Sequence, residues 1–206
     1  MVGRKRAGMA VFRKEAVFLK KLAEARLGEV HAMIRVCPRC PLARSRTRAV
    51  PGEGPARTGV MFIGEAPGAE EDLTGRPFVG MAGRFLNALL AHAGLNRKRI
   101  FITSIVKCRP PKNRLPRQLE ISACAPYLAR QLELTGARLV VLLGNAAIQN
   151  QLDRRFTATR VHGRSFARDG RTYFATYHPA AGMRFPKIGA QMETDFVALR
   201  KLAARK

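Results

Sequence analysis

Four short apolar runs alternate with helical stretches along this chain, and the alternation limits the possible folds more than any other feature. The apolar runs cover residues 59–63, 100–105, 139–143 and 172–176. The helical patterns cover residues 82–93, 117–134, 146–152 and about 191–204. Near-continuous apolar strands are typical of a sheet that is covered on both faces. The pattern therefore predicts an α/β sandwich around a mostly parallel sheet.

The length and charge of the chain narrow the class of protein. With 206 residues, the chain is most simply one domain, residues 1–206, with a basic N-terminal helical extension over about residues 1–30. Thirty-eight Lys and Arg face fourteen Asp and Glu, which gives a net charge of +24. Such a surface attracts polyanions, so nucleic acid is the expected partner and an anionic membrane the second. No apolar run is long enough to span a bilayer.

The basic N-terminus contains an amphipathic pattern. A helix over residues 11–22 would place Phe12, Ala16, Leu19 and Leu22 near one face. We expect this helix to pack on the core, with docking on a membrane as the alternative. The segment contains Glu residues that a transit peptide would avoid, and no secretory signal is apparent, so we expect a cytoplasmic protein.

The four cysteines of the chain are spaced as ligands of a metal centre. Cys37 and Cys40 form a Cys-Pro-Arg-Cys pair, while Cys108 and Cys124 lie far downstream. Two ligands from each region would clamp distant parts of the chain onto one centre. Disulfide bonds are the weaker alternative, because cytosolic thiols stay reduced. Zinc and an iron–sulfur cluster both accept four thiolates, so the cysteine count does not choose between them.

Polar and Gly/Pro-rich segments follow the predicted strands. They are residues 64–68, 107–116, 144–145 and 177–179. In open α/β sheets such loops meet outside the carboxyl ends of the strands, where ligand sites gather. Five of the fourteen acidic residues lie between Glu53 and Asp72. A helix N-terminus would explain Glu70 and Asp72 but explains Glu65 less well, so we expect Glu65 to take part in chemistry or to line a pocket.

Several short motifs occur in order along the chain. They are the cysteine pattern, Gly-Glu-Ala-Pro-Gly-x-x-Glu-Asp at 64–72, Thr-Gly-Arg-Pro-Phe-Val-Gly at 74–80, Lys-Cys-Arg-Pro-Pro-x-Asn-Arg at 107–114 and His-Pro at 178–179. Together they resemble the uracil-DNA glycosylase superfamily, and within it the iron–sulfur branch called family 4, from residue 37 to about residue 186. Such enzymes flip uracil out of DNA and hydrolyse its N-glycosidic bond, which leaves an abasic site for base excision repair.

The resemblance also implies a fold, a cofactor and a partner. The implied fold is a three-layer α/β/α sandwich with a central four-stranded, mostly parallel sheet. The implied cofactor is a [4Fe-4S] cluster held by Cys37, Cys40, Cys108 and Cys124, which favours iron over zinc. The implied partner is uracil-containing DNA, double- or single-stranded, and the implied enzyme is a monofunctional, monomeric glycosylase associated with the nucleoid. A sliding clamp is a partner that the sequence neither indicates nor excludes.

One set of residues matches the base pocket of the family. Gly64 and Ala66 belong to the first motif, and Phe78 matches the residue that stacks on the flipped base. His178 matches the residue that hydrogen-bonds the base and stabilises the departing anion. Ser104 departs from the pattern, because relatives have an Asn there whose amide reads the uracil edge. A single hydroxyl reads less than an amide, so we expect weaker or broader discrimination, with hypoxanthine or xanthine as additional candidate substrates.

The residues that activate water are less clearly indicated. Better-known relatives place a catalytic Asp directly after the position of Glu65, where this chain has Ala. By position, water activation or stabilisation of the cationic sugar falls to Glu65, Glu71 or Asn113. Glu71 has a second interpretation, as a pocket wall near C5 of uracil that excludes thymine. Met183 and Arg184 lie where relatives insert a side chain into the duplex, and an exposed loop with ordinary residues is the equal alternative.

Two rival functions stay open at this point. One is a protein that binds uracil or damaged DNA without turnover, which Ser104 allows. Covalent trapping by the His of a Lys-Arg-Arg-Ile-His insertion is not expected, because residues 112–116 read Lys-Asn-Arg-Leu-Pro. The other rival is a zinc-stabilised nucleic-acid-binding protein with no enzymatic role.

Overall fold

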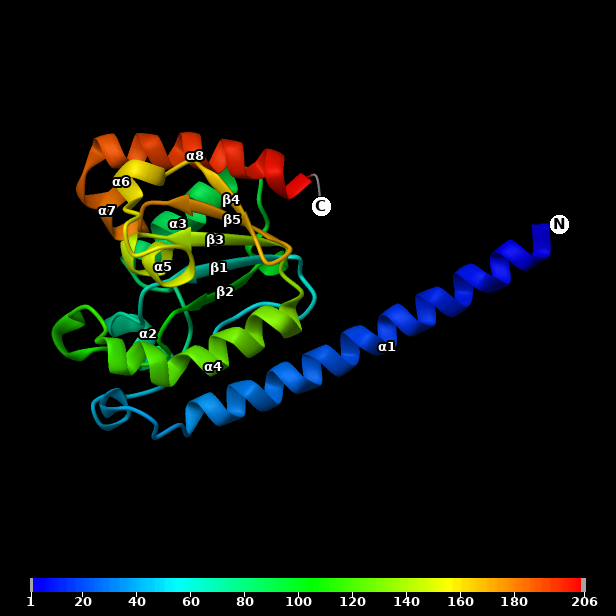
Figure 1. Ribbon diagram of the computed structural model, residues 1–206, viewed down its shortest axis with the longest axis horizontal. Helices are drawn as coiled ribbons and strands as arrows, with labels where there is room; N and C mark the ends of the chain where they lie inside the picture. Colours follow the sequence, from blue (N-terminus) through cyan, green and yellow to red (C-terminus); the bar gives the residue numbers. More distant parts are fainter. Residues whose placement is uncertain (1, 205–206) are drawn as a thin grey trace.

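The structure is a computed structural model that describes residues 2–204, with side chains described for residues 15–204. The strands are β1 (Val60–Gly64), β2 (Phe101–Ser104), β3 (Leu139–Leu143), β4 (Ser165–Arg168) and β5 (Arg171–Thr176). The α-helices are α1 (Val2–Arg35), α2 (Ala69–Thr74), α3 (Met81–His92), α4 (Gln118–Thr135), α5 (Asn145–Gln151), α6 (Ala158–Val161), α7 (Pro179–Arg184) and α8 (Pro186–Ala204). Short 3-10 helices are η1 (Pro41–Arg44), η2 (Arg97–Arg99) and η3 (Pro111–Asn113). Figure 1 shows their arrangement.

The strands form one sheet in the order β2-β1-β3-β5-β4. All neighbouring strands are parallel except β4 and β5, so the carboxyl ends of four strands meet at one edge, as predicted. At that edge the register places Gly64 beside Ser104 and Leu143 beside Thr176. The prediction of a four-stranded sheet is wrong by one strand. The sequence Ser-Phe-Ala-Arg of β4 lies at the sheet edge, mostly exposed, and therefore forms no apolar run.

The helices cover both faces of the sheet, which confirms the three-layer α/β/α arrangement. Neighbouring residues of a strand point to opposite faces. Phe62 of β1 contacts Phe196 of α8, with ring centroids 6.2 Å apart. Met61, on the other face, lies 3.9 Å from the hydroxyl of Thr135 on α4. Phe101, the register partner of Met61, contacts His31 of α1, so α1 and α4 cover this second face.

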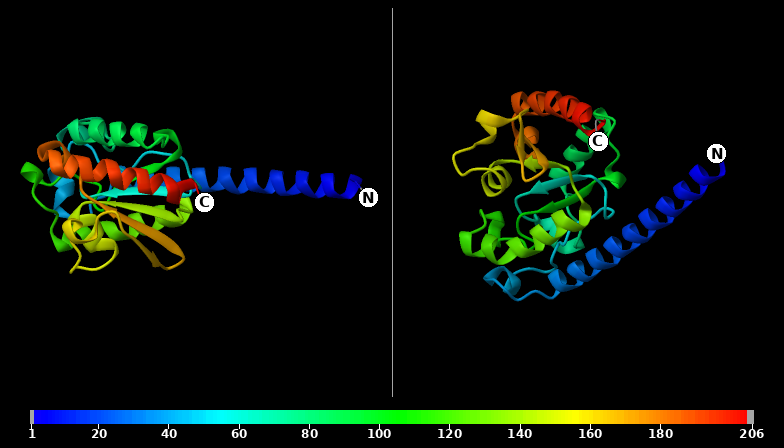
Figure 2. Two further views of the ribbon diagram at one scale, coloured as in Figure 1. Left: turned by 90° about the horizontal axis from the view of Figure 1, so that it is seen from above. Right: turned by 45° about the vertical axis from the view of Figure 1, so that its right-hand side comes forward.

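Helix α1 is longer than predicted and only its second half packs on the domain. Its buried positions Ala23, Leu27, Val30 and Ile34 recur at helical spacing and face α4. The first half extends away from the other helices and the sheet (Figures 1 and 2). Leu19 and Leu22 are therefore 39% and 37% exposed, so the expected core packing of this segment is wrong. The side chain of Phe12, placed on the same predicted face, lies outside the described residues.

The remaining helices follow the predicted ranges closely, with three additions. Helices α3, α4 and α5 begin and end within one or two residues of the prediction, while α8 begins earlier, at Pro186. The three additions are α2, whose first turn contains Glu70, Glu71 and Asp72, the four-residue α6, and α7, which directly follows His178. Residues 179–184 are thus helical, so the exposed-loop alternative for Met183 and Arg184 is wrong. No helix among residues 2–204 has both the length and the apolarity needed to cross a membrane.

Candidate active site

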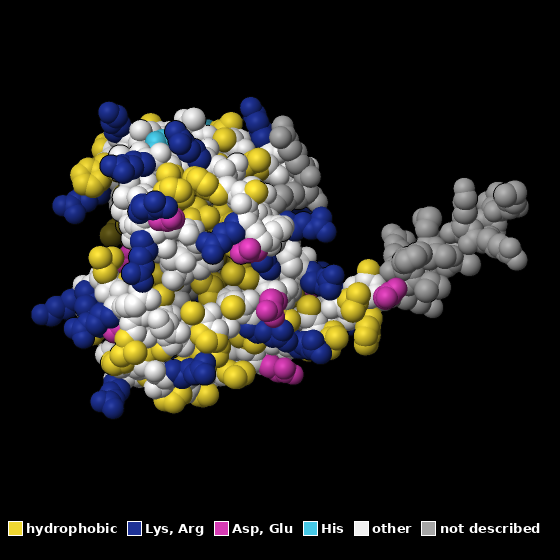
Figure 3. All heavy atoms as spheres, in the orientation of Figure 1, with side chains coloured by type: hydrophobic (Ala, Val, Ile, Leu, Met, Phe, Trp, Pro, Cys, Tyr) yellow, Lys and Arg dark blue, Asp and Glu magenta, His cyan; other side chains and the backbone are white. Residues whose placement is uncertain are grey.

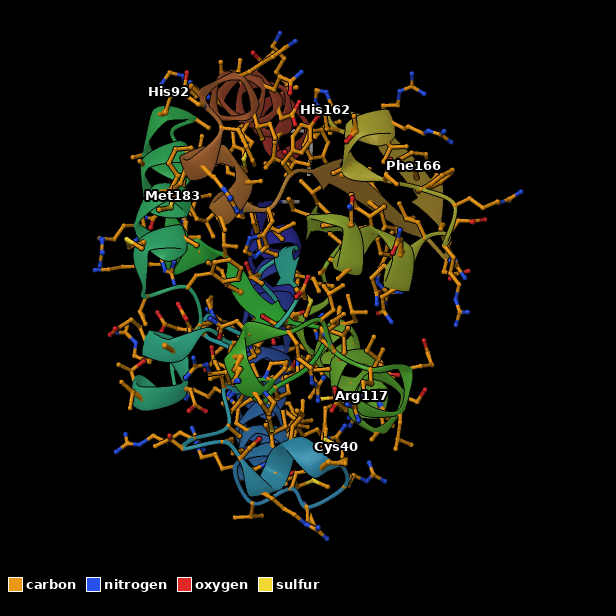
Figure 4. All side chains as sticks on the ribbon, turned by 90° about the vertical axis from the view of Figure 1, so that its left-hand side faces the viewer. Cys40, His92, Arg117, His162, Phe166 and Met183 are labelled. Carbon is orange, nitrogen blue, oxygen red and sulfur yellow. The ribbon has the colours of Figure 1, made fainter. Side chains whose placement is uncertain are left out.

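A cavity of about 370 Å³ lies at the carboxyl ends of β1, β2 and β5. Its lining includes most of the side chains that the motifs single out: Glu65, Ala66, Glu71, Phe78, Ser104, Asn113 and His178. These residues come from four separate segments of the chain, and the parallel sheet brings them together because its strands end at one edge. Figure 4 views the molecule from this end and labels Met183, Arg117 and Cys40.

The Phe78 ring closes one side of the cavity. The side chain is 7% exposed, and its backbone has a φ of +52°, in the left-handed region. Gly64, at the end of β1, lies directly against this ring, because a Cβ on Gly64 would stand 2.6 Å from the ring edge. The His178 ring lies across from it, with the two ring centroids 5.9 Å apart. A planar base that enters the cavity therefore meets a ring that is already in place.

The contacts of His178 select one tautomer. Its Nδ1 accepts the backbone N–H of Ala180 at 3.2 Å and thereby caps α7. In the neutral ring the hydrogen must then lie on Nε2, which is free to donate. Burial lowers the pKa of His178 to about 4, with the nearby Glu71 carboxylate opposing the shift, so the ring is neutral at physiological pH. Gly144 permits the approach of the loop, since a Cβ there would stand 2.8 Å from the Cβ of His178.

Glu65 presents a carboxylate that is available for chemistry. Its side chain is half-buried, and burial raises its pKa above the ordinary value. No side chain or backbone N–H of the described part of the chain donates to this carboxylate. Glu65 and His178 also line an adjoining groove of about 700 Å³ beside α4 and α5. The carboxylate therefore borders both the base cavity and a channel that water can enter.

Glu71 has contacts that favour an organising role. One carboxylate oxygen accepts the backbone N–H groups of Val79 and Gly80, both at 2.9 Å. The other accepts the N–H of Gly68 at 3.0 Å. These three hydrogen bonds join the start of α2 to the segment after Phe78. Because both oxygens are occupied, Glu71 is poorly placed to activate water, although its side chain does line the cavity as the pocket-wall interpretation requires.

Ser104 lies at the cavity floor and is held through its backbone. It is 6% exposed, and its hydroxyl has no partner within the described residues. Its carbonyl accepts the ammonium of Lys107 at 2.7 Å, and the same ammonium donates to Thr103 Oγ1 at 2.6 Å. Lys107 is 1% exposed, and burial lowers its pKa to about 8. Sequence reasoning placed Lys107 in a polar loop and missed this buried contact with the base pocket.

Asn113 lines the cavity, whereas Met183 and Arg184 lie on α7, whose residue Ala180 lines it. Asn113 is exposed, with a φ of +53°, and its side-chain oxygen accepts Arg109 Nε at 2.8 Å. Met183 is 41% exposed in the last turn of α7, and the Arg184 guanidinium stacks 5.5 Å from the centre of the Phe185 ring. Met183 and Arg184 therefore belong to a six-residue helix and not to a loop.

The four cysteines meet in a second small cavity. Cys37, Cys40, Cys108 and Cys124 line it together, and none of them forms a disulfide. An Arg46 guanidinium nitrogen donates to Cys108 Sγ at 3.1 Å and to the Cys37 carbonyl at 2.8 Å. Across residues 15–204, no three His, Cys, Asp or Glu side chains converge closely enough to hold a single metal ion. The fold thus brings all four cysteines to one place, although they come from the segment after α1, the loop after β2 and helix α4.

Comparison with known proteins agrees with this geometry. The family model of the uracil DNA glycosylase superfamily matches residues 51–200. A type-4 uracil-DNA glycosylase of Sulfurisphaera tokodaii is 43% identical over 176 residues, which cover 81% of this chain and 80% of that protein. The type-4 enzyme of Pyrobaculum aerophilum is 42% identical, covering 82% and 90%. That of Archaeoglobus fulgidus is 40% identical, covering 87% and 94%. The region matched by the family model contains the whole sheet and the cavity residues from Glu65 to His178.

Proposed function

Because the chain belongs to the uracil DNA glycosylase superfamily, and within it to the type-4 enzymes, we propose that it hydrolyses the N-glycosidic bond of uracil in DNA. The product is an abasic site, the substrate of later steps in base excision repair. The target base must leave the duplex before it can enter a cavity of this size. Unstacking costs a few kcal/mol, and less at a mispair such as U·G, so a mispaired or unpaired uracil is the favoured substrate.

The observation that carries the proposal is that a stacking ring, a neutral donor and an unpaired carboxylate face one cavity. Phe78 stacks on the flipped uracil, and the Ser104 hydroxyl meets its hydrogen-bonding edge. His178 donates from Nε2 to the base oxygen on which negative charge develops. Glu65 holds the attacking water. These roles are our assignments, supported by the burial, tautomer and free carboxylate described above.

The reaction then needs few steps from the protein. As the C1′–N1 bond breaks, its electron pair leaves with uracil, and His178 stabilises the resulting anion. The water oxygen bonds to C1′ of the cationic sugar from the opposite side. Glu65 attracts the proton of that water, and the raised pKa of its carboxylate makes it a better base than an exposed glutamate. Uracil takes a proton from solvent after release.

We propose that the four cysteines hold a [4Fe-4S] cluster. All four cysteines line one small cavity, and the similarity to the type-4 enzymes supports an iron–sulfur cluster over a single zinc ion. The buried ammonium of Lys107 and the Arg46 donor to Cys108 both favour an anionic thiolate centre. When bound, the cluster supplies no chemistry to the glycosidic bond, and it ties the segment after α1 to α4 and to the loop after β2. Absorbance at about 400 nm in the purified protein tests this assignment. A colourless protein with bound zinc would contradict it.

Cleavage of labelled oligonucleotides tests the activity. Each oligonucleotide carries one uracil opposite G, opposite A or unpaired, and alkali after incubation reveals abasic sites. Strand breaks in the uracil lanes that disappear with the His178→Asn variant would support the proposal. Retained DNA binding and an intact cluster without strand breaks would overturn it in favour of a protein that binds without turnover.

Ser104 favours a broader base range as a second candidate function. Its free hydroxyl and short side chain leave space that an amide would fill, so hypoxanthine is a second candidate substrate. We expect Ser104→Asn to sharpen the preference for uracil over hypoxanthine about fivefold, since one added hydrogen bond is worth about 1 kcal/mol. Parallel uracil and hypoxanthine duplexes measure the ratio, and an unchanged ratio in Ser104→Asn would contradict the idea.

We propose that the enzyme acts as a monomer on double- or single-stranded DNA. Met183 and Arg184 are exposed on α7, whose Ala180 lines the cavity, and we assign them the task of filling the space left by a flipped base.

A further inference from the structure

We propose that Arg97 is a positioning residue for the ring of Phe78, and that the stacking platform depends on this remote guanidinium. The inference rests on the proposed function, because it assumes that the Phe78 ring receives the flipped base. Arg97 lies on η2, outside the lining of the base cavity. It therefore acts through Phe78 and has no contact of its own with the base.

The backbone of Phe78 needs outside support. Its φ of +52° lies in the left-handed region, which residues with a side chain rarely adopt unless surrounding contacts hold them there. Gly83 of α3 permits this geometry, because a Cβ at Gly83 would stand 2.0 Å from the Phe78 carbonyl oxygen. That contact leaves room for the turn but supplies no attraction. The attraction must come from hydrogen bonds to the peptide groups on either side of the ring.

Two charged side chains, those of Arg97 and Glu71, form hydrogen bonds with these peptide groups from opposite ends. We call this pair the clamp of Phe78. On the N-terminal side, Arg97 donates to the carbonyl of Pro77 at 2.7 Å and to that of Phe78 at 3.3 Å. On the C-terminal side, the Glu71 carboxylate accepts the N–H groups of Val79 and Gly80. A cation thus binds the acceptors and an anion binds the donors of one short segment. Charge-assisted hydrogen bonds of this kind are the stronger ones in proteins.

Arg97 is itself held in place. Besides the two carbonyls, its guanidinium donates to the side-chain oxygen of Asn87 on α3, at 2.8 Å. The guanidinium is half-buried, whereas the neighbouring Arg99 is exposed and its side chain has no hydrogen bond within the described residues. Arg97 and Arg99 therefore differ in contacts while sharing residue type, charge and location. This pair provides a matched comparison.

Open space beside Phe78 makes this support necessary. A second cavity, of about 680 Å³, has both Phe78 and Arg97 in its lining. Phe78 thus borders two cavities, so protein does not fill the space around it on every side, and contacts other than packing must help to hold the ring. Without Arg97, we expect the ring to populate positions that no longer stack on uracil. The same opening gives a small cation access to the place of the guanidinium.

The test compares Arg97→Met with Arg99→Met in single-turnover cleavage of a U·G duplex. Displacing a reacting group by about 1 Å costs about 10²-fold in rate, so Arg97→Met should lose about that factor in kcat/KM. Arg99→Met should stay within about twofold, since the exposed Arg99 side chain makes no hydrogen bond within the described residues that the substitution could break. Millimolar guanidinium should restore part of the activity of Arg97→Ala, which a merely unfolded variant would not show. Equal activity of Arg97→Met and Arg99→Met, or no rescue, would overturn the proposal.

A second readout does not depend on catalysis. In protein labelled with 4-fluorophenylalanine, the ¹⁹F resonance of Phe78, assigned with Phe78→Leu, reports the position of the ring. We expect it to broaden or shift in Arg97→Met and to stay unchanged in Arg99→Met. If the wild-type protein cleaves no uracil, the proposed function fails, yet a shifted resonance still supports the clamp. An unmoved resonance in Arg97→Met refutes the clamp whatever the activity.

Discussion

Replacing His178 with Asn separates two tasks of one imidazole. Nδ1 accepts the N–H of Ala180 and caps α7, which leaves Nε2 as the donor. Asn is among the preferred N-cap residues, so its side-chain oxygen can keep the cap. It offers no donor at the position of Nε2. The substitution therefore removes the donor to the departing uracil while the local fold stays in place.

The expected loss follows from this single donor. One well-aimed donor to a developing anion is worth about 3–4 kcal/mol, so the kcat of His178→Asn should fall about 10²- to 10³-fold. His178→Ala should lose the same activity and also the cap, which costs about 1 kcal/mol of unfolding free energy. For a chain of this size that cost lowers Tm by about 2–4 °C. The two variants should thus differ in calorimetry and agree in activity.

The pH dependence adds an independent check. Since burial lowers the pKa of His178 to about 4, the ring stays neutral from about pH 5.5 to 8, and no loss of rate from this group should appear near its ordinary pKa of 6.5. As the pH falls, the imidazole of the unfolded chain takes up its proton at a higher pH than that of the folded protein. The free energy of unfolding therefore decreases as the pH drops from 6.5 towards about 4. Single-turnover cleavage of a U·G duplex measures the rates. A His178→Asn variant within about threefold of wild type would refute the assignment of the donor.

Three further predictions concern neighbouring groups. Glu65→Gln should lower kcat about 10²-fold with little change in Tm, because the carboxylate has no partner to lose among the described residues; unchanged steady-state kinetics would contradict this. Cys108→Ser should release iron and lower both Tm and the absorbance at about 400 nm. A variant that keeps its colour and its iron would count against the cluster. Glu120→Ala should lower Tm by a few degrees, because it removes the buried carboxylate that accepts from the partly exposed Arg114 and from the Arg117 N–H. Arg114 holds the pKa of Glu120 below its ordinary 4.5, so this stabilisation is present above pH 4.5 and is lost as the pH falls below it; urea unfolding at pH 7 and at pH 3 should show the difference from wild type shrinking.

The sheet could be predicted from the sequence because most of its strands depend on local patterns. The run at 139–143 corresponds residue for residue to β3, which is buried throughout. Strand β4 could not be found this way, because an edge strand needs no apolar run and its pairing with β5 is a tertiary contact. Helix α7 was missed for a related reason. Its cap is a histidine, which is not a common cap residue, and it is only six residues long.

The members of the candidate site could be predicted from motifs, but their contacts could not. Glu71 and Glu65 look alike in a motif rich in acidic residues, yet one carboxylate binds three backbone N–H groups and the other has no partner in the described part of the structure. Lys107 looks like a loop lysine and is buried under Ser104. In each case the difference arises from segments that fold together, such as the turn after Phe78 that places two N–H groups against Glu71.

Contacts inside the protein also limit what the net charge of +24 can predict about DNA binding. Each phosphate contact adds about −0.9 to the slope of log K against log salt, so a count of 38 cations would suggest a very steep dependence. Arg46, Arg97, Lys107 and Arg114 already donate to acceptors inside the protein and are not available to phosphates. The surface Lys and Arg side chains are spread over the face drawn in Figure 3, so only some of them can contact one bound duplex. We therefore expect a slope that corresponds to a handful of contacts, measured by titration of a uracil-containing duplex at several salt concentrations, and one that Arg184→Ala lowers in magnitude by about one contact whereas Arg97→Met leaves it unchanged.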